Sequence, residues 1–451
     1  MTLAGGVEGF DVVVVGGRCA GSPLAAHLAR SGLEVCVVDR AEFPSDTIST
    51  HLFQVEGVAV LERLGVVERL RATGAPWIET VSMRVEDVSV RQRLPRRPAD
   101  AGPALCVRRP LLDTVLVERA RESGAQVRTS MRVTGLVEHG GRVCGVKALS
   151  GAGRQVELRA RLVVGADGRA STLARLVGAR SYHVVANQRF GYWAYFEGAR
   201  RESPAAVTFE RWDDELVIGA PTDSGLYIAM TLPPLERLAS FTADLESSFD
   251  AHLAASPLVS AILDGARRTG RPRGTAGYPG FFRESAGPGW VLVGDAGHFK
   301  DPTPGQGISD ALRQGETLAE AIVQGLGGAR PLDAALAHWW RWRDDDAFEM
   351  HWFCSDMGAA GPVPRPFLEM VRDFASRPEG LDAWFEILSH RLEPSEVLTP
   401  ARLLAATARL LGRGSDPRAA VMGEAWRLAA NDVRRKWLRK RPRMTPAADL
   451  A

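Results

Sequence analysis

Three stretches of this chain place glycine directly after a short apolar run, and in two of them an acidic residue stands next to the glycine. The first is the turn Gly16-Gly17-Arg18-Cys19-Ala20-Gly21, which follows the run from Phe10 to Val15. The second is Asp167-Gly168 after Leu162–Val164, and the third is Gly294-Asp295 after Val291–Val293. Glycines let a backbone approach a ligand closely, and the free N–H groups that open a helix attract phosphate. A carboxylate beside them can accept hydrogen bonds from a sugar hydroxyl.

The elements around the first stretch predict how it is positioned. The β-branched run before Gly16 is typical of a buried parallel strand, and Pro23 to Gly32 has helical character. A second strand, Glu34 to Val38, ends in Asp39 and Arg40. A βαβ unit of about 30 residues with an acid at this distance indicates a dinucleotide site. Arg18 replaces the usual middle glycine, so its side chain must turn away or meet a phosphate with its guanidinium.

The three motifs, in this order, resemble those of the class A FAD-dependent monooxygenase superfamily, which includes aromatic hydroxylases, flavin halogenases and geranylgeranyl reductase-like flavoproteins. The resemblance implies an α/β fold. It has a Rossmann-like FAD-binding domain of the glutathione reductase and p-hydroxybenzoate hydroxylase type, a mixed β-sheet substrate domain and C-terminal helices. The expected division is residues 1–181 with 286–327 for FAD, 182–285 for the substrate and 328–451 for the helical region.

The resemblance also implies a role for each motif residue. At the adenosine end, the expected cofactor-binding residues are those of the pyrophosphate turn, the ribose-binding acid with its neighbour, an arginine beside the phosphate and ribose, and the Asp-Gly pair: Gly16, Gly17, Arg18, Gly21, Asp39, Arg40, Arg109, Asp167 and Gly168. Arg108 is the alternative to Arg109. In the family the Asp-Gly acid lies near the pyrophosphate and supports binding of the pyridine nucleotide.

At the flavin end, the resemblance assigns Gly294 and Asp295 to the ribityl chain, Pro302 to the side of the isoalloxazine, and Gly305, Gln306 and Gly307 to its pyrimidine edge. A helix that begins there stabilises negative charge on the reduced ring. The cofactors implied are FAD and NAD(P)H as the reductant.

The residues leave the reaction open between two chemistries. The halogenase Trp-x-Trp-x-Ile-Pro segment is absent, since residues 191–196 read Gly-Tyr-Trp-Ala-Tyr-Phe, and no lysine precedes Lys147. The Asp-Pro-Thr-Pro-Gly-Gln-Gly segment is close to the hydroxylase form, whereas Phe43-Pro44, Ser309 and Gly315-Glu316 are closer to the reductase-like branch. We favour an NAD(P)H-dependent monooxygenase that hydroxylates a hydrophobic or polycyclic small molecule through a flavin C4a-hydroperoxide. The alternative is reduction of a carbon–carbon double bond, as in geranylgeranyl reductases.

His51 is the candidate catalytic residue, because the loop that carries it should pass near the flavin. In the hydroxylase it would contact substrate or exchange a proton, and in the reductase it would donate one. An ordinary loop histidine is the alternative. For His298, a role in ordering its own loop is favoured over chemistry. The aromatics within 182–285 suit an apolar substrate cavity or simply a core.

Composition limits the partners that we expect. A formal net charge of +2 gives no reason to expect nucleic acid, and the five cysteines show no CxxC spacing, so neither a disulfide framework nor a metal site is predicted. No uninterrupted apolar run reaches the roughly 18 residues of a spanning helix. The start of the chain does not resemble a signal peptide, and the expected location is cytoplasmic. The basic segment 434–443 is interpreted as a solvated helix end rather than a membrane or partner patch. The oligomeric state is left open.

Overall fold

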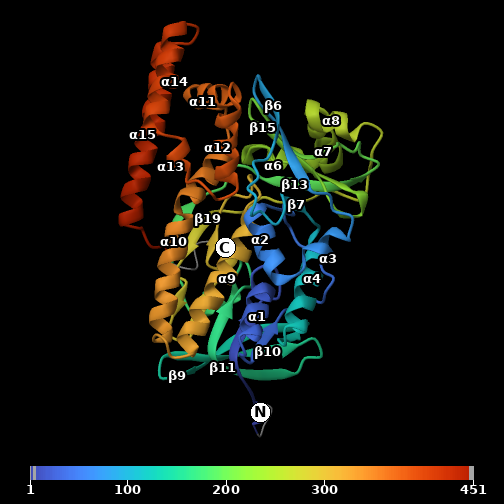
Figure 1. Ribbon diagram of the computed structural model, residues 1–451, viewed down its shortest axis with the longest axis vertical. Helices are drawn as coiled ribbons and strands as arrows, with labels where there is room; N and C mark the ends of the chain where they lie inside the picture. Colours follow the sequence, from blue (N-terminus) through green and yellow to red (C-terminus); the bar gives the residue numbers. More distant parts are fainter. Residues whose placement is uncertain (1, 4–6, 446–451) are drawn as a thin grey trace.

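The computed structural model describes residues 2–3 and 7–445, and a mostly parallel sheet lies at its centre (Figure 1). Its strands follow the order β20-β21-β11-β2-β3-β8. They are β20 (Ala286–Gly287), β21 (Trp290–Leu292), β11 (Gln155–Gly165), β2 (Val7–Val15), β3 (Val35–Val38) and β8 (Gln126–Arg128). Val12, Val13 and Val14 are fully buried, which explains why the central strand is apolar without alternation.

Each face of this sheet has its own covering layer, because successive side chains of a strand point to opposite faces. Val12 and Val14 pack among helices, whereas Val13 and Val15 pack against strands and a short helix. The helical layer contains α1 (Gly21–Arg30), α2 (Val55–Leu64), α3 (Val67–Arg71), α4 (Arg109–Glu122) and α9 (Gly307–Leu326). The opposite layer contains β9 (Met131–His139), β10 (Arg142–Ser150) and α5 (Thr172–Leu176).

A second, largely antiparallel sheet has the order β17-β13-β16-β15-β14-β5-β6, with β18 beside β13. These strands are β5 (Ile78–Val85), β6 (Val88–Arg93), β13 (Gly191–Glu197), β14 (Ala205–Trp212), β15 (Glu215–Pro221), β16 (Tyr227–Thr231), β17 (Arg267–Arg268) and β18 (Arg273–Thr275). One face packs under α6 (Leu238–Ala243), α7 (Leu245–Ala254) and α8 (Pro257–Leu263). The other face contributes Trp193 and Met230 to an apolar cluster that also contains Leu52 of β4 (Leu52–Phe53) and Cys106 of β7 (Leu105–Cys106).

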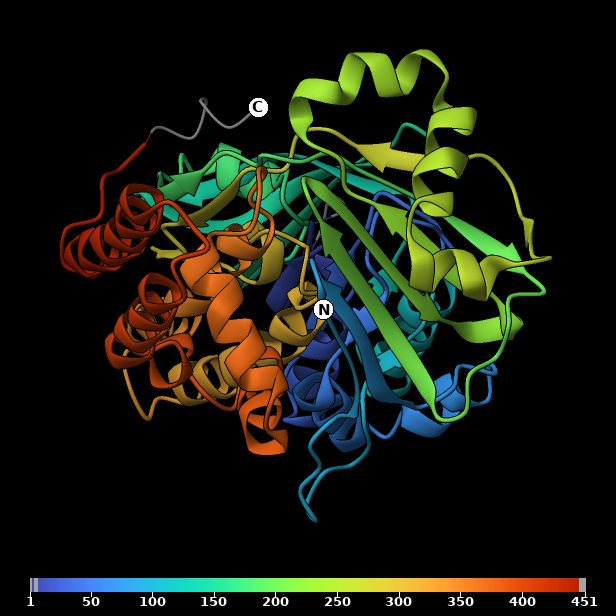
Figure 2. The ribbon, with the colours of Figure 1, turned by 90° about the horizontal axis from the view of Figure 1, so that it is seen from above.

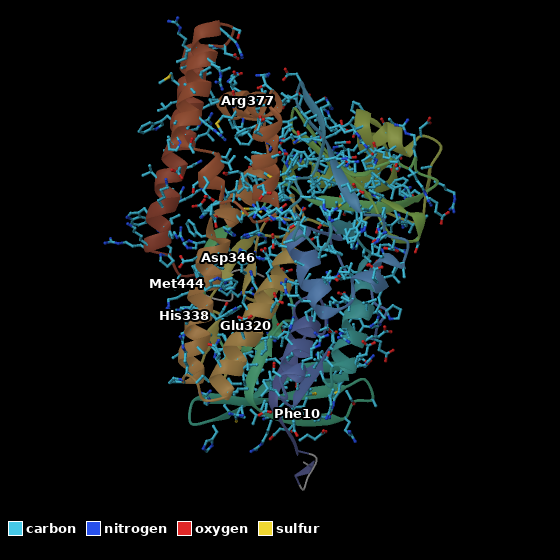
Figure 3. The ribbon with its side chains drawn as sticks, viewed as in Figure 1. Phe10, Glu320, His338, Asp346, Arg377 and Met444 are labelled. Carbon is cyan, nitrogen blue, oxygen red and sulfur yellow. The ribbon has the colours of Figure 1, made fainter. Side chains whose placement is uncertain are left out.

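Helices complete the described chain and stand along one side of the molecule (Figure 2). They are α10 (Leu332–Met357), α11 (Arg365–Ala375), α12 (Pro378–Leu388), α13 (Pro394–Val397), α14 (Pro400–Arg413) and α15 (Arg418–Lys440). Asp346 of α10, labelled in Figure 3, accepts a hydrogen bond from Arg313 of α9 at 2.6 Å. Helices α10 to α14 also share an apolar cluster with Met83 and Val88 of the second sheet. The C-terminal helices therefore contact both the helical layer of the first sheet and the second sheet.

The fold class expected from sequence is confirmed, with one difference in the second sheet. Residues 78–93 form β5 and β6 of that sheet, although the expected division left them in the FAD-binding unit. β5 enters through a parallel pairing with β14, a contact between segments more than 100 residues apart. The three-way division itself stays a prediction. No helix among residues 2–3 and 7–445 is long and apolar enough to cross a membrane.

Candidate active site

The turn after β2 is so tight that two of its glycines admit no side chain. Gly16 has φ +102°, and a Cβ there would lie 2.4 Å from the carbonyl oxygen of Ala166. A Cβ on Gly21 would lie 1.8 Å from the carbonyl oxygen of Gly16. The turn is therefore packed directly against the end of β11, next to Asp167. Within the described chain, the N–H groups of Arg18, Cys19 and Ala20 have no hydrogen-bond acceptor, so they are free for an anionic ligand.

Asp39 ends β3 beside this turn and is only 6% exposed. Its two carboxylate oxygens accept hydrogen bonds from the backbone N–H groups of Gly17 at 2.7 Å and Ala41 at 2.8 Å. These bonds fix the carboxylate at the edge of the turn while leaving lone pairs for a ribose hydroxyl. The adjacent Arg40 is exposed.

Arg18, which replaces the middle glycine, turns toward α4. Its guanidinium donates to the buried Asp113 at 2.6 Å and to the hydroxyl of Ser45 at 2.8 Å. Asp113 also accepts two hydrogen bonds from Arg109, at 3.0 and 3.1 Å. The side chain of Arg18 therefore pairs with Asp113 and Ser45, and its contact with a phosphate stays a prediction.

The two candidate arginines, Arg108 and Arg109, point in different directions. Arg109 is buried beside Asp113, and although burial alone would lower its pKa, the charge of Asp113 raises it. Asp295 also acts electrostatically on Arg109. Arg108 instead donates to Asp223 from its backbone and its Nε, both at 2.7 Å, and lies over the ring of Tyr195. Arg109 thus pairs with Asp113 within electrostatic reach of Asp295, and Arg108 faces the second sheet.

Asp295 lies in a short 3₁₀ turn, Gly294–Ala296, directly after β21. Gly294 has φ +60°, and a Cβ there would lie 2.9 Å from the Cβ of Ala20, so the Gly-Asp motif touches the first glycine turn. Asp295 has no hydrogen-bond partner among the described residues. Burial raises the pKa of Asp295 to about 6; Arg109 opposes this shift and Asp310 adds to it. Asp295 is half-buried, so its carboxylate is partly desolvated without a partner, which suits a ligand that brings its own hydroxyl donors.

This desolvation predicts a pH-dependent gain in stability for Asp295→Asn in the apoprotein. The pKa is about 6 in the folded chain against an ordinary 3.8, so the ionised form is the one that folding disfavours. The wild-type carboxylate therefore costs stability above pH about 6, and this cost disappears as the pH falls toward 3.8. We expect the variant to be more stable by up to about 3 kcal/mol above that range and equal below it. Denaturant titration across pH measures the difference, and a pH-independent difference would contradict the assignment.

The third motif leads into the N-terminus of α9. Pro302 and Gly305 close a turn through a 2.9 Å backbone hydrogen bond, and Gly305 has φ +69°. Gln306 is the N-cap without a side-chain capping bond, and the N–H groups of Gln306, Gly307 and Ile308 have no acceptor within the described residues. A Cβ on Gly307 would be 4.0 Å from Asp295 Oδ1. This helix end therefore offers a positive dipole beside Asp295.

Sequence reasoning missed a buried ion pair behind this loop. Lys300 is 5% exposed and its Nζ lies 2.6 Å from Asp310 Oδ2 in the first turn of α9. It also donates to Gln306 Oε1 at 3.0 Å, while Gln306 Nε2 donates to the carbonyl of Leu388 at 2.8 Å. The residue therefore fixes the loop and links it to the C-terminal helices. A lysine within the third motif, in a chain with only four lysines, was the available signal.

His51 is brought to the same region. It is fully buried with φ +59°, and its Nε2 lies 2.7 Å from the hydroxyl of Tyr195 on β13. The next residue, Leu52, packs on Gly305, where a Cβ would be 3.1 Å from the leucine side chain. Burial, reinforced by Arg109, lowers the pKa of His51 to about 3, so the imidazole is neutral. No sequence pattern indicates Tyr195 as the partner of His51.

Asp167 and His298 have local structural roles. Asp167 accepts hydrogen bonds from Ser171 Oγ at 2.5 Å and from the N–H of Thr172 at 2.7 Å, so it caps α5. Its neighbour Gly168 has φ +80° with open space around it. His298 is buried against the ring of Phe282 at 4.3 Å. The contacts of His298 agree with a role in ordering its loop.

Comparison with known proteins identifies the family to which this chain belongs. The model of the FAD-binding domain family matches residues 9–237, which is more than half of the chain. The chain belongs to this family of flavoproteins. It is therefore related to FAD-dependent oxidoreductases of the hydroxylase and monooxygenase-like superfamily, as the motifs predicted.

Relatives of this flavoprotein have several different activities. Menaquinone reductase of Mycolicibacterium smegmatis is 31% identical over 335 residues, covering 70% of this chain and 76% of that protein. The 6-methylpretetramide 4-monooxygenase of Streptomyces rimosus is 30% identical, with 70% and 76% covered. A pyrrole-2-carbonyl carrier-protein brominase of Pseudoalteromonas luteoviolacea is 26% identical, with 71% and 79% covered. In structure, a flavoprotein/dehydrogenase of Cytophaga hutchinsonii superposes with TM-score 0.75 at 17% identity, over 91% of this chain and all of that one.

The site of this flavoprotein fits FAD at both ends. The unbonded N–H groups of the first turn suit a pyrophosphate, and those at the start of α9 suit the electron-rich edge of a flavin. The unpartnered carboxylate of Asp295 lies between them, as a polyhydroxyl chain requires. The assignment of each residue to particular FAD atoms stays a prediction.

Proposed function

We propose that this flavoprotein is an NAD(P)H-dependent monooxygenase that hydroxylates a hydrophobic or polycyclic small molecule. The observation that supports this most is the open N-terminus of α9 beside Asp295, backed by the apolar cluster of Leu52, Trp193 and Met230. When bound, FAD supplies two-electron redox chemistry and the activation of dioxygen. The similarity to 6-methylpretetramide 4-monooxygenase agrees with a polycyclic substrate.

In this proposal the chain's own residues bind, orient and exclude water. Arg109, Asp39 and the glycine turn hold the adenosine half, and Asp295 with the start of α9 holds the flavin half. Lys300 and Gln306 keep the loop rigid, and the apolar cluster around Leu52 would exclude water beside it. The neutral His51–Tyr195 pair can hold or pass a proton at Tyr195 Oη.

One further observation favours a second candidate, the reduction of a carbon–carbon double bond. A menaquinone reductase is as similar as the monooxygenase, and His51 with Tyr195 forms the kind of proton donor that such a reduction needs. The Gly315-Glu316 pair no longer supports this branch, because both residues have structural explanations. Gly315 lets α9 approach Ala20, and Glu316 accepts two hydrogen bonds from Arg63.

Product mass distinguishes the reactions. The purified protein with FAD is reduced with NADPH without oxygen, then exposed to air with 6-methylpretetramide or menaquinone, the compounds named by two relatives. One added oxygen supports the proposal, and two added hydrogens that are gained without oxygen and remain after the quinone ring is reoxidised in air support the reductase. A halogen isotope pattern when bromide is present would overturn both. FAD that NADPH does not reduce with either compound would exclude NAD(P)H as the direct reductant.

We expect His51→Asn to slow product formation by about 10²- to 10⁴-fold if the pair transfers a proton. Asparagine tolerates the positive φ of this position better than most residues, so the backbone should be retained. FAD content and the rate of FAD reduction should stay unchanged, and stopped-flow absorbance measures both steps. Tyr195→Phe should reproduce the defect, and His139→Asn, an exposed residue of β9, is the matched control. Normal turnover in both site variants would leave His51 as an ordinary structural residue.

A further inference from the structure

Helix α15 exposes a continuous apolar stripe. It lies at the outer edge of the molecule and packs on α14 and α11 through its other side, where Val421 is fully buried (Figure 1). Residues at offsets of 4, 7, 8, 11 and 15 from Met422 line one face of a helix. They are Trp426, Ala429, Ala430, Val433 and Trp437. Met422 is 53% exposed, Trp426 73%, Val433 68% and Trp437 48%.

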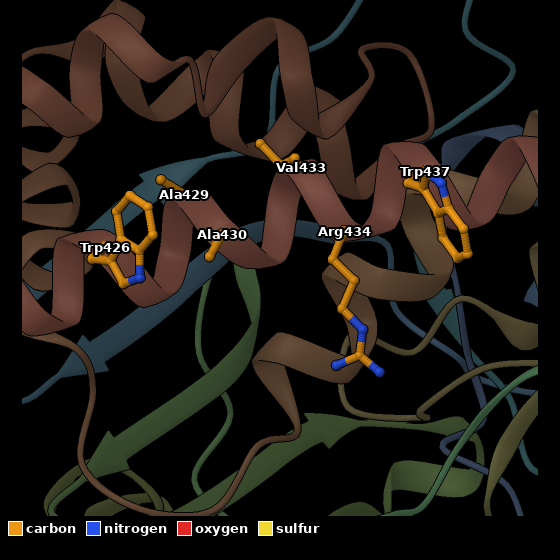
Figure 4. Close-up of a pocket in the computed structure, with 6 residues that line it drawn as sticks. All are labelled: Trp426, Ala429, Ala430, Val433, Arg434 and Trp437. Carbon is orange, nitrogen blue, oxygen red and sulfur yellow. The ribbon is translucent and has the colours of Figure 1, made fainter.

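These side chains form a shallow site rather than scattered surface residues. An open groove of about 500 Å³ lies along this face of α15 (Figure 4). It is lined by Trp426, Ala429, Ala430, Val433, Arg434 and Trp437. Isolated exposed apolar residues are normal, but a run of two tryptophans, a valine and a methionine along four turns is not. Leaving so much apolar surface in water is unfavourable, which indicates that another surface covers the stripe.

Positive charge borders the stripe on both sides. At 100° per residue, Arg427 and Arg434 fall on one border and Arg418 and Lys436 on the other, and Lys440 and Arg441 follow at the C-terminal end of the stripe. Of these six, only Lys436 has an ion pair among the described residues, with Asp432 at 2.8 Å. The helix's other acid, Glu424, is bound to Arg365 on the packed side. The exposed half of α15 is therefore apolar in the middle and cationic at both edges.

We propose that α15 is an interfacial helix that docks this protein on the surface of an anionic phospholipid bilayer. Tryptophan beside Lys and Arg is the composition that favours the headgroup boundary, where the ring is buried and the cations meet phosphate. A second copy of the chain is a poorer occupant, because two cationic helices would repel each other along the same stripe. The helix lies on the bilayer and does not cross it. The inference is independent of the proposed reaction.

Flotation of the full-length flavoprotein with vesicles tests the proposal. We expect it to float with vesicles that contain phosphatidylglycerol, to stay behind with pure phosphatidylcholine, and to detach as salt is raised. Trp426→Ser with Trp437→Ser should lower the vesicle partition coefficient at least tenfold. Arg427→Glu with Arg434→Glu should lower it by at least roughly 25-fold and flatten its salt dependence, since each cation near such a surface contributes roughly fivefold.

The control reverses two exposed arginines away from α15, Arg121→Glu with Arg132→Glu, for the same change in net charge. This control should bind vesicles as the wild type does. An unchanged flavin spectrum in every variant excludes misfolding. The proposal would be overturned if the wild type does not bind vesicles that contain phosphatidylglycerol. It would also be overturned if the control loses as much vesicle binding as the α15 variants do. A wild-type dimer in light scattering that the tryptophan variant converts to monomer without lipid would also overturn it, in favour of a second copy.

Discussion

Replacing Asp295 by alanine is expected to raise the dissociation constant of FAD by about 5- to 150-fold. The carboxylate has no partner within the described residues, so it is available to hydroxyl donors of the cofactor. Hydrogen bonds to a charged group contribute about 1–3 kcal/mol, which corresponds to this range of affinity. Titration of the apoprotein with FAD, followed by flavin fluorescence, gives both constants.

Two further variants test whether the loss of FAD affinity comes from the carboxylate of Asp295 itself. Asp295→Asn keeps an acceptor without the charge, so its affinity should fall between those of the wild type and alanine. Asp333→Ala removes an exposed acid of α10 that pairs with Arg142, and it should leave FAD affinity unchanged. Wild-type affinity in Asp295→Ala would refute the assignment of this residue to the cofactor.

The glycine motifs could be predicted because they depend on local geometry. Gly21 is required by a contact within one βαβ unit and Gly16 by its positive φ beside the end of β11, and the spacing of both from Asp39 appears directly in the sequence. The sequence leaves two possibilities for the side chain of Arg18, and it does not indicate the observed partner, Asp113, which is 95 residues further along the chain. Local patterns thus identified the backbone of the site but not the partners of its side chains.

Contacts between distant segments explain what sequence reasoning missed. The pairing of β5 with β14 adds residues 78–93 to the second sheet, although their alternation alone does not say which sheet they join. Tyr195 is hydrogen-bonded to His51, which is 144 residues away in the sequence, and Gln306 is hydrogen-bonded to Leu388, which is 82 residues away. Close packing of α9 on Ala20 accounts for Gly315, and an exposed ion pair with Arg63 accounts for Glu316, although the two residues had resembled a functional signature.

The buried pair of Lys300 and Asp310 gives the largest predicted effect on stability. Lys300→Met would leave Asp310, which is 6% exposed, without its main countercharge, and Gln306 Oε1 without its donor. Removing one partner of a buried pair costs about 3–5 kcal/mol, because the remaining charge is uncompensated. The free energy of unfolding in urea should fall by this amount. FAD affinity should fall too, since Gln306 helps to fix the start of α9.

The double variant Lys300→Met with Asp310→Leu separates the charge from the packing. Replacing both members of a buried ion pair by apolar residues is often neutral, so most of the lost stability should return. The pH dependence supplies an independent check. Burial would raise the pKa of Asp310, but Lys300 and its neighbours hold it below 3.8, so the wild-type pair is lost as the pH falls through that lowered value. In Lys300→Met burial should dominate and reverse the sign, making the single variant relatively more stable in acid. A double variant no more stable than Lys300→Met would mean that the lysine stabilises the loop through Gln306 rather than through Asp310.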